Sequence, residues 1–450
     1  MRREGAIAIV GMAARFAGAE DLHAYWDLIL AGRHRFGPPP RDRWDASVFT
    51  DSNPRSVDKS YAPAGGFIED VRSFPALALQ IPPRRVEVMD PQQRLSLEAA
   101  IYALEDAGYR RSAVPRRTGV FMGVTGLEYA MLMASRVLAQ MMACGDFGEA
   151  PDPEVLARAV QNVVPPRPLA APGGLGNMVA AAVSQELDLH GPAFTVDAAC
   201  ASSMVALDTA VQQLRSGTID LALAGGVFLQ LTPNHHVVFS RIGAMSRSGV
   251  CRPFDHRADG FVEGDGVGTV VLKRYEEAVR DGDRIYAVLH GVATNNDGRG
   301  DGPMAPLSEG QAGAVSAAWE ASGLDPADLG YLETHGTGTA VGDPTEIAGL
   351  MQSIGPAVKD AALGASKANV GHTMSAAGVA GLIRAALAIH HRVLPPLAGF
   401  ERPREDIDLA STPFRVPTQP EPWETPHRIA GVSSFGFGGT NAHAVLSGVD

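Results

Sequence analysis

Short apolar runs rich in β-branched residues recur along the chain, separated by longer stretches whose apolar positions have helical spacing. The runs cover residues 7–11, 118–124, 194–196, 221–227, 269–272 and 285–292. Strands that alternate with helices are typical of an α/β protein with a largely buried sheet. The pattern therefore predicts an α/β fold.

The predicted elements recur in a similar order in two parts of the chain. Strands before residue 266 surround Cys200, and a second set after it holds His335, Lys367 and His372. Only the order of elements recurs, because no repeat is visible at the level of single residues. We expect two similar α/β halves, residues 1–265 and residues 266–450.

One helix is predicted directly after Cys200. Its apolar positions follow one another at steps of three and four residues, at Met204, Leu207, Val211 and Leu214. Gly217 stands where a glycine commonly ends a helix. Cys200 is therefore expected between a strand and the N-terminus of a helix.

The composition excludes several classes of protein. Of the 450 residues, 45% are hydrophobic and 20% are charged, which is typical of a chain with a substantial core and excludes a disordered chain, a collagen or a coiled coil. The formal net charge of −12 argues against a general nucleic-acid binder, which needs an excess of basic residues. No apolar run reaches the roughly 18 residues of a membrane span. We expect a soluble protein that binds neither nucleic acid nor membrane.

The N-terminus and the cysteines bear on the cell compartment. Arg2 and Arg3 before an apolar run imitate a signal peptide, but the run is short, rich in β-branched residues and ended by Gly11, which favours a strand. The chain has three widely spaced cysteines, Cys144, Cys200 and Cys251. They offer neither a disulfide framework nor a paired zinc site, so we expect a cytoplasmic protein without a metal.

Cys200 is the first candidate for chemistry, in the sequence Thr-Val-Asp-Ala-Ala-Cys-Ala-Ser-Ser at residues 195–203. A cysteine at a helix N-terminus faces unpaired N–H groups and the positive end of the helix dipole, which stabilise a thiolate suited to acyl transfer. A lone cysteine among small residues is also commonly a core residue. The motif alone leaves both interpretations open.

Two histidines with small neighbours are candidates for the same site. His335 follows a predicted strand and precedes Gly-Thr-Gly-Thr, whose glycines let a substrate approach the backbone and whose Thr337 and Thr339 supply hydroxyls. His372 ends the sequence Ser-Lys-Ala-Asn-Val-Gly-His, in which Lys367 would favour a thiolate or hold a carboxylate. Taken singly, the histidines also fit structural roles and the lysine a solvated one.

The last candidate is Ser-Ser-Phe-Gly-Phe-Gly-Gly-Thr-Asn-Ala-His at residues 433–443. Its three glycines leave backbone N–H groups free at a surface where an oxyanion could form. The alternative is a tight hairpin with aromatic anchors.

These four motifs, in this order, resemble those of the β-ketoacyl synthase family, and the resemblance covers nearly the whole chain. Further matches are Ile-Ala-Ile-Val-Gly-Met at 7–12, Asp-Arg-Trp-Asp at 42–45, Asp-Pro-Gln-Gln-Arg at 90–94 and Arg-Pro-Phe-Asp at 252–255. The chain is similar to the ketosynthase domains of type I polyketide synthases, modular and iterative, and of polyunsaturated fatty acid synthases.

The resemblance implies a thiolase-like fold, with two similar βαβαβαββ halves in a five-layered α-β-α-β-α core, usually as a homodimer. It implies a ketosynthase that joins an acyl-enzyme thioester to a malonyl-type extender on acyl carrier protein by decarboxylative Claisen condensation. No cofactor would be bound permanently, because substrates arrive on the phosphopantetheine of the carrier protein. Other synthase domains would load the extender, since neither an acyltransferase Gly-x-Ser-x-Gly nor a carrier-protein serine motif is visible.

The resemblance also implies catalytic roles. Cys200 resembles the nucleophile that accepts the acyl group. His335 and His372 resemble the residues that act in decarboxylation and stabilise the enolate, and Lys367 would contribute to the electrostatics around them.

Binding roles follow in the same way. The backbone N–H groups of Cys200 and Phe437 match the oxyanion hole of the family. Those of Thr337 and Thr339 match its contacts with pantetheine or extender, and Phe437 also resembles the gatekeeper of the acyl tunnel.

The chain departs from the family pattern in two places. Polyketide ketosynthases commonly have Asp-Thr-Ala-Cys-Ser-Ser-Ser, whereas Asp-Ala-Ala-Cys-Ala-Ser-Ser here is closer to the polyunsaturated fatty acid synthase style. The segment 124–177 is also longer than the compact pattern and carries a helical stretch with four methionines, Met131, Met133, Met141 and Met142. We interpret these methionines as ordinary core, with a substrate-lining role as the alternative.

Two other functions stay open within the resemblance. A non-condensing domain that only transfers acyl chains usually lacks the residue matching His335. A silent dimer partner of the chain-length-factor kind lacks the cysteine, and members that only decarboxylate carry Gln in its place. Because Cys200 and His335 are both present, the sequence favours the condensing enzyme.

Overall fold

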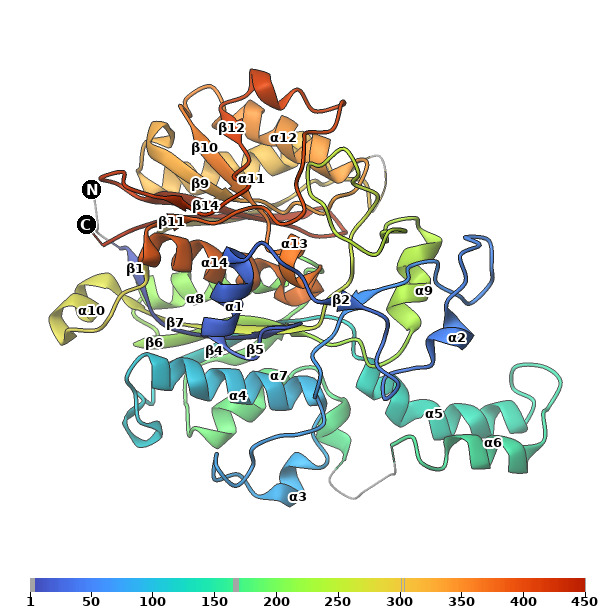
Figure 1. Ribbon diagram of the computed structural model, residues 1–450. Helices are drawn as coiled ribbons and strands as arrows, with labels where there is room; N and C mark the ends of the chain where they lie inside the picture. Colours follow the sequence, from blue (N-terminus) through green and yellow to red (C-terminus); the bar gives the residue numbers. More distant parts are fainter. Residues whose placement is uncertain (1–4, 165–169, 301, 303, 450) are drawn as a thin grey trace.

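Eleven strands form one hydrogen-bonded sheet through the molecule, in the order β12-β10-β9-β14-β15-β8-β1-β7-β6-β4-β5 (Figure 1). The computed structural model describes residues 5–164, 170–300, 302 and 304–449. One arm of the sheet consists of β1 (Ile7–Phe16), β4 (Thr118–Val124), β5 (Ala193–Val196), β6 (Leu221–Phe228) and β7 (Gly266–Arg274). The other arm consists of β8 (Ala287–Asn296), β9 (Leu329–Glu333), β10 (Ala361–Gly364), β14 (Ile429–Phe435) and β15 (Thr440–Ser447), with β12 (Phe414–Arg415) at its edge.

The two arms have the same topology. The order β5-β4-β6-β7-β1 in one arm corresponds to β10-β9-β14-β15-β8 in the other. In each arm the first three strands are parallel and the last two pair antiparallel. This confirms the predicted α/β fold with two similar halves.

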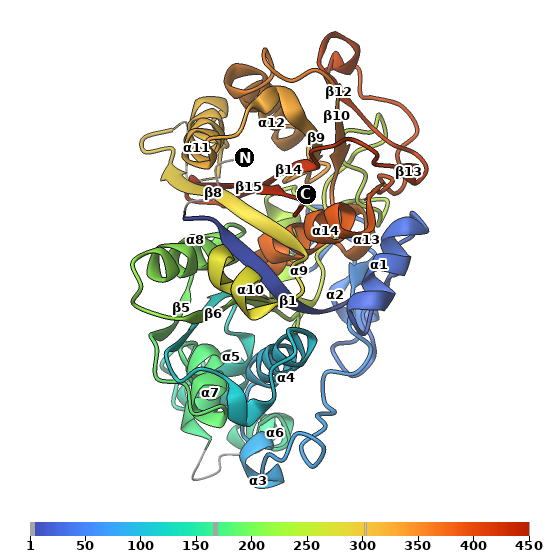
Figure 2. The same cartoon turned by 90° about the vertical axis from the view of Figure 1, so that its left-hand side faces the viewer.

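Six helices complete the two βαβαβαββ units and give five layers (Figures 1 and 2). Helices α4 (Pro91–Asp106) and α7 (Met178–Glu186) cover the outer face of the first arm, and α11 (Ser308–Ser322) and α12 (Gly342–Ser353) cover that of the second. Helices α8 (Ser202–Arg215) and α14 (Ala377–His391) lie between the arms and are buried from both sides.

The two arms meet at a narrow seam. Strands β1 and β8 pair antiparallel over three residues, Ile7–Ile9 with Ala287–Leu289. Below the seam α8 packs against α14, where the N–H of Val379 donates to Oγ of Ser203 over 3.0 Å. A Cβ on Gly378 would lie 2.4 Å from Cγ of Met204, so only glycine permits this approach of the two helices.

The sequence-based division at residues 265 and 266 does not coincide with strand pairing. Strand β7 begins at Gly266 and pairs with β6 and β1, so it lies with the first arm. The two arms therefore separate after β7 and the short helix that follows it. As a boundary between domains, the division stays a prediction.

Shorter elements surround the five layers. They are the helices α1 (Leu22–Leu30), α2 (Ala46–Phe49), α3 (Pro83–Val86), α5 (Glu128–Ala143), α6 (Pro153–Val160), α9 (Asn234–Arg241), α10 (Tyr275–Asp281) and α13 (Lys367–Val370), and the strands β2 (Phe36–Gly37), β3 (Gly65–Gly66), β11 (Val393–Leu394) and β13 (Glu421–Pro422). Five 3₁₀ turns complete the described part, at Arg111–Ala113, Ala171–Gly174, Pro326–Asp328, Met374–Ala376 and Leu409–Ser411. No helix in this part is both long and apolar enough to cross a lipid bilayer.

Local sequence signals are confirmed where they were strongest. Strand β4 has the bounds that its apolar run predicts, and α8 follows Cys200 with all four predicted apolar positions buried. Gly217 follows the end of α8 with a φ of 71°, in the left-handed region where glycine avoids the strain of a side chain.

The interpretation of the methionines as core is wrong for the single chain. They lie on α5, which together with α6 projects from the body of the molecule (Figure 1). Met131, Met141 and Met142 are exposed, and Met133 is half-buried. Apolar composition alone did not reveal that this helix packs against little of its own chain.

Candidate active site

Cys200 lies where the sequence predicts it, between the carboxyl end of strand β5 and the N-terminus of α8. The preceding residue, Ala199, has a φ of 49°, a conformation that L-residues rarely adopt. Oγ of Ser202 accepts from the N–H of Ala198 and donates to the carbonyl of Ala199, which holds this sharp turn. Oγ of Ser434 donates to the carbonyl of Cys200 over 2.8 Å and fixes it from the second half.

The protonation of Cys200 differs from the sequence-based expectation of a stabilised thiolate. Burial raises the pKa of the thiol to about 11, although Lys367 and the backbone N–H groups of Phe437 and Cys200 act to lower it. The sulfur therefore rests as a thiol at neutral pH. The two N–H groups beside it are the pair expected to form an oxyanion hole.

His335 follows β9, and its tautomer is set by the backbone. The N–H of Phe435 donates to Nδ1 of His335 over 3.2 Å, so Nδ1 is an acceptor and Nε2 carries the proton. Burial and the charge of Lys367 hold the pKa of His335 well below its usual range. The ring is a neutral hydrogen-bond donor at Nε2.

His372 has the same character. Its Nδ1 accepts the N–H of Met374 over 3.2 Å, and burial followed by the charge of Lys367 lowers its pKa well below the usual range. Its ring meets that of His335 edge to face, with centroids 5.6 Å apart. The two neutral imidazoles therefore lie side by side, each with a protonated Nε2.

Lys367 lies behind the histidines and not on the cavity wall. Its Nζ donates to the carbonyl of His335 over 2.5 Å and lies 3.5 Å from Nδ1 of that ring. The carboxylate of Glu346 accepts the N–H groups of His335 and Gly336 over 2.7 and 2.8 Å. Burial lowers the pKa of Lys367 and raises that of Glu346 to about 7.

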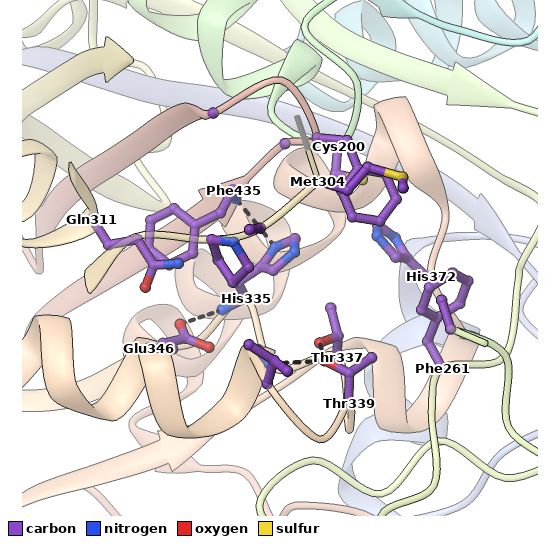
Figure 3. Close-up of a pocket in the computed structure, with 18 of the residues that line it drawn as sticks. Cys200, Phe261, Met304, Gln311, His335, Thr337, Thr339, Glu346, His372 and Phe435 are labelled. Carbon is purple, nitrogen blue, oxygen red and sulfur yellow. Dashed lines mark hydrogen bonds between the residues drawn. The ribbon is translucent and has the colours of Figure 1, made fainter. Parts of the chain in front are cut away.

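These side chains surround one cavity of about 300 Å³ (Figure 3). Cys200, His335 and His372 line it, and so do Thr337 and Thr339, whose hydroxyls are 2.9 Å apart. Half-exposed Phe437 completes the wall. The structure thus brings six of the seven predicted site residues to one cavity and places the seventh, Lys367, directly behind it.

Sequence reasoning missed two supports of this site. The motifs above do not include Glu346, yet its carboxylate holds the His335 loop by two hydrogen bonds. The N–H of Phe435 fixes the His335 tautomer from the neighbouring strand. Glu346 follows His335 by only 11 residues, which was a usable signal, whereas the Phe435 contact spans 100 residues.

The chain matches three family models, which together span nearly all of it. They are described as β-ketoacyl synthase, N-terminal domain, over residues 4–278; β-ketoacyl synthase, C-terminal domain, over residues 286–401; and ketoacyl-synthetase C-terminal extension, over residues 403–450. The first two models meet in the segment after β7, which is also where the strand pairing separates the two arms.

Known proteins are similar over the whole chain. The chain is 41% identical to a phenolphthiocerol/phthiocerol polyketide synthase protein of Mycobacterium tuberculosis, over 98% of this chain and 27% of that protein. It is 40% identical to the polyketide synthase ThaG of Burkholderia thailandensis, over 98% of this chain and 8% of that protein. The chain therefore spans a minor part of these relatives.

Two solved structures have the same fold. The oxazolomycin ketosynthase domain OzmH KS7 of Streptomyces albus JA3453 superimposes with a TM-score of 0.88 at 35% identity, over 99% of this chain and 74% of the other. The ketosynthase from module 6 of the bacillaene synthase of Bacillus subtilis 168 gives a TM-score of 0.85 at 35% identity, over 99% and 72%.

Proposed function

This chain belongs to the β-ketoacyl synthase family, as a ketosynthase of the polyketide synthase kind, and from that premise we propose that Cys200, His335 and His372 carry out its decarboxylative Claisen condensation. The observation that supports these roles is the arrangement of one thiol, two neutral Nε2–H donors and two backbone N–H groups around one cavity. A thiol accepts an acyl group, and uncharged donors stabilise developing negative charge on oxygen.

Acyl loading uses the thiol and the two backbone donors. The Cys200 sulfur attacks the thioester carbonyl of an acyl chain on phosphopantetheine, and the N–H groups of Cys200 and Phe437 hold the oxyanion. The carbon–sulfur bond to pantetheine then breaks, and the proton from the thiol ends on the departing pantetheine sulfur. A thiolate of high pKa is scarce at neutral pH but strongly nucleophilic.

Condensation uses the two histidines. The malonyl-type extender loses carbon dioxide, and the electron pair of the broken bond forms an enolate whose oxygen accepts Nε2–H bonds from His335 and His372. The enolate carbon attacks the acyl-Cys200 carbonyl, the Cys200 sulfur leaves, and one proton from solvent restores the thiol. The product is a β-ketoacyl chain on the carrier.

The carrier reaches this site through the cavity. We assign contacts with pantetheine or extender to Thr337 and Thr339, which line the same cavity as the histidines. The enzyme is an acyltransferase without a permanently bound cofactor in this proposal, since the carrier's phosphopantetheine brings both substrates. Acyl carrier protein is accordingly its partner, and an acyltransferase domain elsewhere supplies the extender.

Homodimer formation is part of the proposal. Strand β5 is an outer edge of the described sheet and presents Phe194, which is 39% exposed. Helix α5 adds Met131, Met141 and Met142, all exposed. An exposed strand edge and exposed apolar side chains are two kinds of surface that a second chain covers. The cytoplasmic location stays a prediction.

The proposal is tested by product formation. Wild-type protein incubated with an acyl thioester and malonyl-acyl carrier protein should yield a β-ketoacyl carrier, seen by intact-protein mass spectrometry, and Cys200→Ala should yield none. Cys144→Ala is the matched control, because Cys144 is exposed and remote in sequence from every site motif. Product from Cys200→Ala, or a wild type that loads acyl groups and never condenses them, would contradict the proposal.

A further inference from the structure

His235 lies in a buried charge cluster that the mechanism above does not use. Its Nδ1 is 3.2 Å from Oε1 of Glu263, whose carboxylate is completely buried. Glu128, 1% exposed, adds a second negative charge beside the ring. Oε2 of Glu263 has no hydrogen-bond partner within the described chain, and Nε2 of His236 lies 3.6 Å from it.

The fold makes room for the His235 ring against an aromatic neighbour. The ring stacks on Phe228 with centroids 5.2 Å apart and planes 11° apart. A Cβ on Gly126 would lie 2.5 Å from Cε1 of His235, and Gly126 has a φ of 68°, so glycine is required there on both grounds. A cationic imidazole gains from the face of an aromatic ring in a desolvated place.

Phe239 connects this cluster to the cavity. On α9, one turn after His235, its ring meets that of His235 edge to face at 5.8 Å. It also lies 5.6 Å from Phe261 and 6.1 Å from Phe437, and both of these line the cavity. Phe261 in turn meets the ring of His372 at 5.1 Å. Residues 242–244, directly after α9, form a further part of the cavity wall.

Glu263 connects the cluster to His372 by a second route. Glu263 and His372 form a parallel β-bridge, in which the N–H of His372 donates to the carbonyl of Val262 and the N–H of Gly264 donates to the carbonyl of His372. The carboxylate that holds His235 is thus on the segment that holds the His372 backbone.

The charged groups around His235 favour its protonated form. Burial lowers the pKa of His235, but the hydrogen bond and charge of Glu263 and the charge of Glu128 outweigh burial and raise the pKa of this imidazole above its usual range. Asp265, the next carboxylate, is bound by Arg43 at 2.9 Å. His236 stays neutral, because burial lowers its pKa to about 4.

We propose that His235 is a positioning residue of the ketosynthase, whose positive charge between Glu263 and Glu128 fixes α9 so that Phe239 supports Phe437 and Phe261. The inference rests on the proposed function for its meaning in catalysis. The support is present while His235 is protonated and is lost as the pH rises through its pKa.

The test compares His235→Gln with wild type between pH 6 and pH 9. At pH 6 we expect acyl loading from a thioester to be about fivefold slower in the variant, because the N–H of Phe437 is less well placed. Alkylation of Cys200 by iodoacetamide should be about fivefold faster, because the cavity wall is less rigid. Both ratios should approach one at the upper pH. His23→Gln, at a side chain 86% exposed, is the control and should show neither effect.

A second variant keeps the test decisive where His235→Gln folds poorly. Glu128→Gln removes one charge that raises the pKa of His235, so His235 should lose its proton at a lower pH in this variant. The loading and alkylation rates of the variant should therefore depart from their low-pH values at a lower pH than those of the wild type. A variant-to-wild-type ratio that is constant across the pH range would overturn the inference, because a purely structural role has no such profile. If the wild type accepts no acyl group at any pH, the proposed function fails, while the iodoacetamide ratio still tests His235.

Discussion

The backbone N–H of Phe435 donates to Nδ1 of His335 over 3.2 Å, which leaves the imidazole only its Nε2–H to present to the cavity. The hydrogen bond joins the end of β14 to the loop after β9. It assigns His335 the role of a hydrogen-bond donor and excludes that of a base that removes the Cys200 proton through Nδ1.

His335→Ala should therefore separate loading from condensation. The variant keeps the thiol and both backbone donors, so it should still form an acyl-enzyme, but carbon dioxide release from malonyl-carrier protein should fall about 10² to 10³-fold because one enolate donor is lost. Labelled carbon dioxide release and intact mass measure the two steps. Normal decarboxylation in this variant would remove His335 from its proposed role, and His190→Ala, at an exposed histidine, serves as the control.

The high pKa of Cys200 predicts a pH dependence for its reactivity. The rate of alkylation by iodoacetamide should keep rising from pH 7 to pH 10, because the thiolate fraction increases up to a pKa of about 11. The alkylated site is identified by peptide mass spectrometry. A rate that levels off below pH 8 would show that the helix dipole and Lys367 outweigh burial.

The protein should sediment as a dimer. A second chain that pairs along β5 and covers the apolar side chains of α5 would bury the exposed edge of the sheet. Analytical ultracentrifugation at several concentrations measures the mass. A monomer at micromolar concentration would refute the assembly.

Met142→Trp tests whether α5 influences substrate choice. Met142 is exposed on the single chain, so the larger ring is tolerated in the fold, and if a second chain covers α5, the ring will narrow any channel between the two chains. We expect loading of longer acyl chains on Cys200 to change while acetyl loading stays intact. Unchanged selectivity would restrict α5 to a structural or assembly role.

The stability of the fold should depend on the buried His443. Burial lowers its pKa from 6.5 to about 3, and Nδ1 is 3.0 Å from Oγ of Ser433. The unfolded chain therefore binds a proton between pH 6.5 and pH 3 that the folded chain excludes, and stability falls with falling pH through that window by about 1.4 kcal/mol per unit for one group. His443→Asn should have a shallower slope than wild type, measured by urea unfolding at pH 7 and pH 5. Equal slopes would contradict the lowered pKa.

The sequence predicted those elements whose bounds depend on the spacing of apolar residues within a short segment. The bounds of β4 and the helix after Cys200 follow from periods within a dozen residues, and the motifs around Cys200, His335 and His372 follow one another in a recognisable order. Distances between these motifs depend on the packing of two arms that are far apart in the chain. The exposure of the α5 methionines and the raised pKa of Cys200 were missed for the same reason, since burial is a property of the assembled layers.

The layer between the two arms sets the gap across which the chemistry takes place. Cys200 stands at the start of α8 in the first half and His372 shortly before α14 in the second, while the strand pairing that joins the two arms in the described part of the chain consists of three residue pairs, between β1 and β8. The contact between Gly378 and Met204 sets the distance between α14 and α8. A methyl group added at Gly378 is expected to separate α8 from α14 and to change the distance between Cys200 and His372, although neither Gly378 nor Met204 lines the cavity.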